Sequence, residues 1–240
     1  LLENNKHVLV EKPITLNVRD AEDLNDLAKK KNVVLMVGHL LLFHPAFIKM
    51  KEIILSGKLG KLQYMYSNRL NLGTVRTEEN SLWSFAPHDF SLFQYFSESD
   101  PVSVVSNGGA FLQSHIHDTT LTVVKYPSNI VGHIFVSWLH PFKEHRFVVI
   151  GSKGMLVYED SSSDKELLFY QKGIDWINGE PVKRDGVTKK ISYDRCSPLN
   201  KEIQHFLDCI DNKDINNKIN GEKGIEVLKL LSKAQESLEH

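Results

Sequence analysis

"HVLVEKPITL" (residues 7–16) sets the first element of the fold. The segment begins with the apolar run Val8-Leu9-Val10 and then meets the charged pair Glu11-Lys12 and Pro13. A short apolar run that stops at a turn residue is typical of a strand buried on both faces. Proline fixes its own φ and has no backbone donor, so it ends such a strand. The sequence therefore predicts a buried strand over residues 7–10, with Lys12 at its carboxyl end.

A helix and a second strand are expected directly after this segment. Helical spacing of apolar residues covers 18–31, and Thr15 or Asn17 is suited to cap its first turn. The apolar run 33–37 then ends at Gly38. Strand, helix and strand within about thirty residues predict a right-handed unit with two parallel strands.

The remaining chain mixes helices with many short strands. We expect helices over residues 45–56, 83–96, 198–211 and 221–237. We expect strands over residues 60–66, 102–111, 119–126, 130–138, 147–150 and 155–158, the last five as an antiparallel meander, with two more strands within 161–192. The fold class is therefore α+β: the tail of an α/β domain, followed by a domain built on a large, mostly antiparallel open sheet flanked by helices.

Composition excludes several classes of function. The chain has 240 residues with a net charge of −1 and 41% hydrophobic residues, which is ordinary for a soluble globular protein. A balanced charge gives no general attraction to nucleic acid or to a membrane surface. No apolar run is long enough to span a bilayer, and no signal peptide is visible. The two cysteines, Cys196 and Cys209, are too few for a disulfide framework, so we expect a cytoplasmic protein.

Four motifs occur in an order that resembles a known family. They are EKP at 11–13, VGH…FHP at 37–45, LWSFAPHDFSLFQYF at 82–96 and GSKG at 151–154. Together they resemble the Gfo/Idh/MocA family of NAD(P)-dependent oxidoreductases, which are mostly sugar dehydrogenases. Within that family, residues 71–89 most resemble the UDP-N-acetylglucosamine 3-dehydrogenases.

The resemblance implies a Rossmann domain followed by an open-sheet domain. Residues 1–38 match only the C-terminal remnant of that Rossmann domain, and 39–240 match the substrate-binding and oligomerisation domain. The phosphate-binding loop G-x-G-x-x-G is expected earlier in the family, yet no two glycines here stand two residues apart. We therefore expect a piece of a longer protein that binds NAD or NADP poorly and is nearly inactive by itself.

The resemblance also implies the residues that carry the chemistry. Lys12 matches the lysine that lies beside the nicotinamide and the reacting hydroxyl, and His88 matches the general base. The family commonly has an acid four residues before this histidine, where this chain has Ser84, so we keep Ser84 as an orienting group. Cofactor contacts are expected from Glu11, Lys12, Pro13 and His39. From residue type alone, Lys12 also suits an exposed strand end, and His88 also suits packing against Pro87.

Four basic residues are candidates for binding the substrate, together with Ser84. Arginine and lysine side chains near the motifs suit phosphate or carboxylate groups of a nucleotide sugar, although each also suits a surface ion pair. These basic residues are Arg69, Arg76, Lys143 and Arg146. We expect no metal site, because His115 and His117 lack a further identifiable ligand. The GxxG at 151–154 predicts a hairpin turn.

Three functions stay open at this point. The first is NAD(P)-dependent oxidation of a sugar hydroxyl, with a nucleotide sugar such as UDP-N-acetylglucosamine as the substrate. The second is a non-catalytic scaffold or dimerisation module, with the open sheet as a homo-oligomer interface formed by Val123, Ile134, Val136 and Trp138. The third is a family member that acts on a free sugar, an inositol or a diol.

Overall fold

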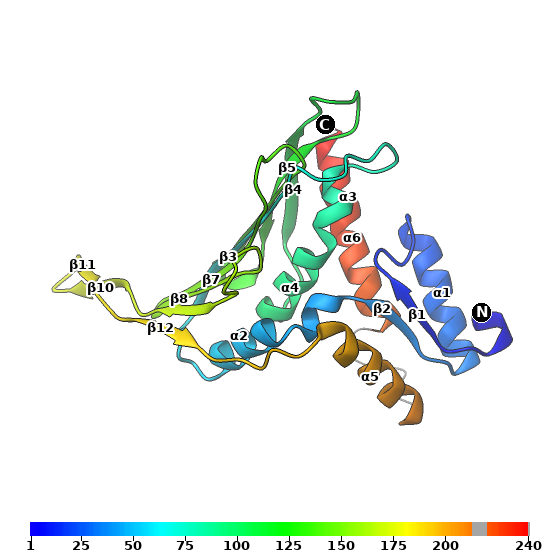
Figure 1. The fold of residues 1–240 in the computed structure, drawn as a ribbon, viewed down its shortest axis with the longest axis horizontal. Helices are drawn as coiled ribbons and strands as arrows, with labels where there is room; N and C mark the ends of the chain where they lie inside the picture. Colours follow the sequence, from blue (N-terminus) through cyan, green and yellow to red (C-terminus); the bar gives the residue numbers. More distant parts are fainter. Residues whose placement is uncertain (213–219, 240) are drawn as a thin grey trace.

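The computed structural model describes residues 1–212 and 220–239. A small α/β unit formed by the N-terminal segment lies beside a large curved sheet, and helices fill the space between them (Figure 1). The N-terminal strands are β1 (Val8–Glu11) and β2 (Leu35–Gly38), with α1 (Val18–Lys31) between them in the chain. The predicted α+β class is confirmed.

The N-terminal unit has the predicted parallel pairing. β1 and β2 run in register from Val8 opposite Leu35 to Glu11 opposite Gly38. Asn17 caps α1 by accepting a hydrogen bond from the Asp20 amide at 2.8 Å, which satisfies a donor that the first turn leaves open. Helices cover both faces of the pair, which explains why the strands are apolar throughout.

The large sheet has eight strands in the order β12-β9-β8-β7-β3-β6-β5-β4. The strands of this sheet are β3 (Leu62–Leu70), β4 (Ser103–Gly109), β5 (Thr119–Lys125), β6 (Val131–Ser137), β7 (Glu144–Gly151), β8 (Gly154–Glu159), β9 (Leu167–Tyr170) and β12 (Thr188–Ile191). The predicted uninterrupted meander is wrong, because β3 enters between β6 and β7. β3 pairs with β6 in parallel, whereas the other neighbours are antiparallel. The hairpin predicted at 151–154 is confirmed between β7 and β8.

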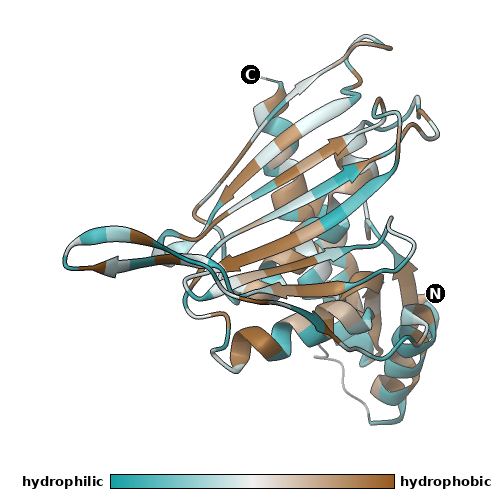
Figure 2. Cartoon of the chain, turned by 60° about the vertical axis from the view of Figure 1, so that its left-hand side comes forward, coloured by the Kyte–Doolittle hydropathy of each residue, from teal (hydrophilic) through white to brown (hydrophobic). Residues whose placement is uncertain are grey.

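Helices cover one face of this sheet and leave the other open (Figures 1 and 2). The covering helices include α2 (Pro45–Leu55), α4 (Pro87–Ser97) and α6 (Gly221–Leu238), and α5 (Pro198–Asp211) lies beside the N-terminal unit. Aromatic rings fill the covered side: Phe147 of β7 meets Phe47 and Phe93 edge to face, with ring centroids 5.3 and 5.7 Å apart.

The expected oligomer face needs a correction. Ile134, Val136 and Trp138 are fully buried, and the first two belong to the core beneath the helices. Side chains alternate along β6, so the residues between them face outward. Val123 does lie on the open face, where it is half-buried opposite Val105, and this face also exposes Tyr64, Val105 and Leu121.

Two further elements differ from expectation. The helix expected over 83–96 is two helices, α3 (Ser81–Phe85) and α4, because Pro87 cannot donate the backbone bond that would join them. The segment 161–192 holds four strands and not two, since β10 (Gly173–Ile177) and β11 (Glu180–Arg184) form a projecting hairpin (Figure 2). Its turn, Asn178-Gly179, has positive φ at both residues, as a tight two-residue hairpin requires. None of the described helices is long and apolar enough to cross a membrane.

Candidate active site

Lys12 joins the N-terminal unit to the sheet domain. It follows β1 at the carboxyl end of the parallel pair, and Pro13 comes next across a cis peptide bond. Its ammonium group donates a hydrogen bond of 2.9 Å to the backbone carbonyl of Ser84 at the end of α3. Burial lowers the pKa of Lys12, and the negative charge of Glu79 opposes that effect. Lys12 is thus held inside the molecule and is not a free surface side chain.

His88 lies in the first turn of α4, close to Lys12. Its Nδ1 is buried and has no hydrogen-bond partner among the described residues. Burial lowers the pKa of His88 well below 6.5, and the charges of Arg69 and Lys12 lower it further. At neutral pH this ring is therefore uncharged and able to accept a proton.

Ser84 and His88 lie in consecutive helices, α3 and α4, which meet at Ala86, and Ala86 itself has αR backbone angles. The role of Ser84 as an orienting group stays a prediction. Ser84 contributes to the cluster through its backbone carbonyl, which accepts from Lys12. The carboxylate nearest to His88 along the chain is Asp89, which is 1% exposed.

Asp89 forms a buried ion pair with Arg69 of β3. Arg69 Nε lies 2.6 Å from Asp89 Oδ2, and the two side chains are 14% and 1% exposed. Burial raises the pKa of Asp89, and the charge of Arg69 opposes that effect. The pair holds the Arg69 guanidinium at the centre of the cluster, where its charge acts on Lys12 and His88.

His145 is a member of the cluster that the sequence did not single out. It stands opposite Arg69 in the β3–β7 register and contacts the ring of Phe85 on the covered side of the sheet. Its Nε2 is buried without a partner among the described residues, and burial lowers its pKa to about 4. The sequence did indicate this position, because His145 lies two residues before the core residue Phe147 on one strand, and residues two apart point to the same face.

The carboxyl edge of β1 and β2 carries more unsatisfied polar atoms. His39 directly follows β2, is 1% exposed, and neither ring nitrogen has a described partner. Burial, together with the positive charge of Lys12, lowers its pKa to about 4. Glu202 of α5, another residue that sequence reasoning missed, is buried near Glu11, and burial raises its pKa to about 7. Orphaned polar atoms of this kind are met by an ordered water, an ion or a polar ligand.

Three of the basic candidates lie outside the cluster. Arg76 is ion-paired with Glu79 at 2.9 Å, and its side chain is 56% exposed at the rim. Lys143 is exposed at the same rim, where its charge acts on His145. Arg146 lies on the open face of the sheet and pairs with Glu159, since its side chain alternates with that of His145. No group of metal-ligating side chains is found in the described ranges 1–212 and 220–239.

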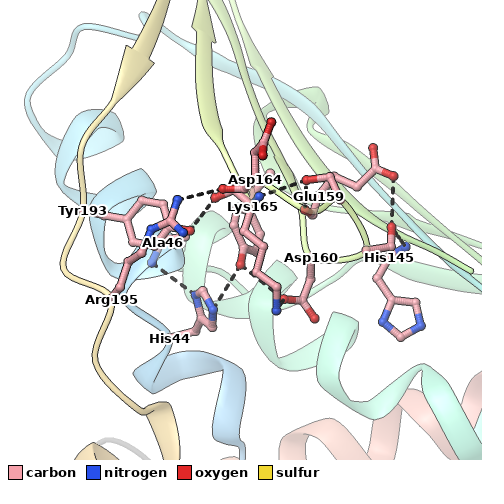
Figure 3. A network of polar contacts seen from close by, with 12 residues as sticks. His44, Ala46, His145, Glu159, Asp160, Asp164, Lys165, Tyr193 and Arg195 are labelled. Carbon is pink, nitrogen blue, oxygen red and sulfur yellow. Dashed lines mark hydrogen bonds and ion pairs between the residues drawn. The ribbon is translucent and has the colours of Figure 1, made fainter.

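A polar network supports the wall next to His145 (Figure 3). His44 caps α2 through its Nδ1, which accepts from the Ala46 amide, and its Nε2 lies 3.1 Å from the Tyr158 hydroxyl. The Tyr158 hydroxyl donates to Asp160 at 3.3 Å, and the Asp160 amide donates to the His145 carbonyl at 2.9 Å. These bonds tie the carboxyl end of β8 to β7 and so hold the backbone of His145 in place.

Two family models match the chain in the order of these elements. The model described as "Oxidoreductase family, NAD-binding Rossmann fold" matches residues 1–39, and the model described as "GFO/IDH/MocA C-terminal domain" matches 47–157. The chain belongs to the Gfo/Idh/MocA family. Within this Gfo/Idh/MocA chain, Lys12 lies in the first matched region, whereas Arg69, His88 and His145 lie in the second.

Individual relatives act on different substrates. The chain is 26% identical to scyllo-inositol 2-dehydrogenase (NAD(+)) of Bacillus subtilis (strain 168), over 93% of this chain and 68% of that protein. It is 24% identical to UDP-N-acetylglucosamine 3-dehydrogenase of Acidithiobacillus ferrooxidans, over 85% of this chain and 62% of that protein. The fold matches a solved structure of the latter enzyme, GnnA, with a TM-score of 0.83 and 21% identity, over 99% of this chain and 73% of that chain. The chain spans about half to two thirds of the length of the curated relatives that it matches.

Proposed function

We propose that this chain supplies the substrate-side chemistry of an NAD(P)-dependent oxidoreductase that oxidises a secondary hydroxyl of a sugar or polyol. The observation that carries the proposal is the convergence of Lys12 and His88 at the carboxyl edge of the parallel strands, the edge at which open α/β sheets bind ligands. Membership of an oxidoreductase family supports the same reaction class.

His88 and Lys12 divide the proton chemistry between them. The uncharged His88 has a buried nitrogen without a partner, so it accepts the proton that leaves the substrate hydroxyl. The Lys12 ammonium donates one hydrogen bond to the Ser84 carbonyl, which leaves two N–H donors for the substrate oxygen. These donors stabilise the negative charge that grows on this oxygen as the proton leaves. Arg69 adds positive charge and, with Lys12, keeps His88 neutral.

His39 and Glu11 would hold the nicotinamide end of the cofactor. They stand at the carboxyl ends of β2 and β1, and the orphaned ring nitrogens of His39 fit a polar ligand at that edge. The bound nicotinamide supplies the acceptor for the hydride that leaves the substrate carbon. The choice between NAD and NADP depends on an acidic or basic residue at the ribose, which we assign to no residue of this chain.

The finer substrate proposal is a nucleotide sugar such as UDP-N-acetylglucosamine, with a free sugar, an inositol or a diol as the alternative. The rim cations Arg76 and Lys143 support the first, because an extended substrate would bring a diphosphate past them. The inositol dehydrogenase among the relatives supports the second.

We also propose that two copies associate through the open face of the large sheet. Tyr64, Val105 and Leu121 are 40%, 50% and 44% exposed on that face. An exposed apolar sheet face of this kind favours association. If the chain were only a scaffold, this surface would be its functional site and the cluster at Lys12 would have no role.

NADH formation at 340 nm tests the reaction, in this chain and in any longer product of the same gene. Lys12→Ala and His88→Ala should each lower the rate by about two to four orders of magnitude, since both act in proton transfer. Lys183→Ala is the matched control, because that lysine lies in the projecting hairpin and forms an ion pair with Asp185. Rates that are indifferent to Lys12 and His88 would favour the scaffold.

A further inference from the structure

Gln235 of α6 accepts two hydrogen bonds from the start of α3 through a single oxygen atom. Asn80 Nδ2, at the N-cap of α3, lies 2.7 Å from Gln235 Oε1, and Trp83 Nε1 lies 3.1 Å from the same atom. The nitrogen of the Gln235 amide is engaged as well, because it donates to Glu239 Oε1 at 2.9 Å. Two donors that converge on one atom require an acceptor there, so position 235 is suited to an amide or a carboxylate.

α3 depends on such contacts to keep its place. It has five residues, and an isolated helix of that length is unstable in water. The Asn80 side chain caps the helix by accepting from the Trp83 amide at 3.1 Å, and the Ser81 amide donates to the His117 carbonyl at 3.0 Å. The Trp83 ring packs against the core of the N-terminal unit and against the core beneath the large sheet. Gln235 therefore holds α3 by its side chains at the junction of the two units.

The same segment surrounds the Lys12 ammonium group. The Ser84 carbonyl of α3 accepts from Lys12 Nζ at 2.9 Å. The carboxylate of Glu79, which directly precedes the cap residue Asn80, also acts on Lys12 through its charge. A shift of α3 would therefore move both of these groups relative to Lys12, which comes from the other unit.

We propose that Gln235 is a positioning residue for Lys12, because it fixes α3 and with it the Ser84 carbonyl that orients the Lys12 ammonium group. The inference rests on the proposed function of Lys12 and adds a residue from the last helix of the chain. The hydrogen bonds of Gln235 go to Asn80, Trp83 and Glu239, so it acts through α3 and not on the substrate. A misplacement of about 1 Å in a reacting group can lower a rate about a hundredfold.

Kinetics of NADH formation give the first test, in this chain and in any longer product of the same gene. Gln235→Leu removes the acceptor and keeps a side chain of similar size. We expect kcat to fall about ten- to a hundredfold with little change in KM, because the substrate oxygen meets Lys12 in the transition state. Gln235→Glu/Glu239→Gln exchanges the two partners and keeps an acceptor at 235, so it should retain most of the wild-type rate. Gln204→Leu is the matched control, because Gln204 is exposed on α5 and donates to Asp208 at 2.8 Å.

Competitive labelling with acetic anhydride, read by mass spectrometry, gives the second test and needs neither turnover nor cofactor. It measures the pKa and the accessibility of Lys12, whose pKa burial lowers. In Gln235→Leu we expect this pKa to rise towards its usual value and the labelling at high pH to become faster, because the released side chain reaches water. The exchanged pair and the control should both match the wild type.

Circular dichroism verifies that each variant is folded under the conditions of both assays. If Gln235→Leu does not fold, Trp83→Phe takes its place, since it removes one of the two donors and keeps an aromatic ring. This variant should move the Lys12 pKa in the same direction by a smaller amount. Wild-type labelling of Lys12 in the folded variant, or an exchanged pair that is as impaired as Gln235→Leu, would overturn the positioning role.

The two proposals fail in distinguishable ways. If Gln235→Leu alters the labelling of Lys12 but no sugar or polyol yields NADH with the wild type, the oxidoreductase function fails and the positioning role stands. If the wild type yields NADH and folded Gln235→Leu matches it in both kcat and labelling, the function stands and the positioning role fails.

Discussion

Gly132 of β6 should be intolerant of a single added methyl group. A Cβ at this position would lie 2.4 Å from Cε2 and 2.6 Å from Cδ2 of Phe93, whose ring is fully buried on α4. The ring also packs edge to face on Phe147, so it has little room to move. Overpacking of this kind costs about 1–3 kcal/mol. We therefore expect Gly132→Ala to be destabilising although alanine suits a strand no worse than glycine.

Thermal and urea denaturation give the size of this effect. For a chain of this length, 1 kcal/mol corresponds to about 2–4 °C in Tm. Phe93→Val removes the clashing ring atoms and alone should cost about 2–4 kcal/mol, because it leaves a cavity. The double variant should be more stable than the sum of the single effects predicts, by more than about 0.5 kcal/mol.

Two results would refute this reasoning. Wild-type stability of Gly132→Ala would mean that the sheet and α4 separate easily at this contact. Simple additivity of the two changes would mean that the cost of Gly132→Ala comes from the strand itself and not from the ring. Because α4 also carries His88, we expect any loss of stability here to be accompanied by a lower rate of NADH formation.

Lowering the pH should weaken the fold through His39, whose pKa burial lowers from 6.5 to about 4. Between about pH 6.5 and 4 the unfolded ring binds a proton that the buried ring does not bind, so the contribution of His39 to the free energy of unfolding is complete above about pH 6.5 and is lost as the pH falls towards 4. This contribution amounts to about 3 kcal/mol in urea denaturation. His39→Asn should make the free energy of unfolding depend less on pH. Tyr64→Glu on the open face should convert the proposed dimer to monomer in light scattering, whereas Leu55→Glu, which is more exposed but lies on α2, should not. Asn220→Ala should cost about 1 kcal/mol, because Asn220 caps α6 by accepting from the Lys223 amide at 3.1 Å, and Asn220→Asp should restore it.

Local sequence patterns predicted the elements that local forces form. The βαβ unit follows from two apolar runs, the Asn17 cap and the spacing between them, all within residues 7–38. The break at Pro87 and the Asn178-Gly179 turn were also visible in the sequence but were missed. Both errors came from underweighting single residues that fix the backbone.

Non-local contacts explain what the sequence did not reveal. Nothing in residues 62–70 indicates that this strand enters between β6 and β7, because all three are strands of similar length that mix polar and apolar side chains. The Arg69–Asp89 pair and the position of His145 follow from that insertion. The sequence nominated Arg146 in place of its neighbour His145, since the choice of face depends on a register that was unknown.

The central place of β3 also has a consequence for the order of folding. β3 ends at Leu70, whereas its two partners, β6 and β7, end only at Ser137 and Gly151. During synthesis at about 5–20 residues per second, β3 therefore waits on the order of ten seconds with both edges unpaired. A strand with unpaired edges is prone to aggregate, so nascent chains should need protection in this interval. The sheet cannot form on both sides of β3 before β7 has emerged from the ribosome.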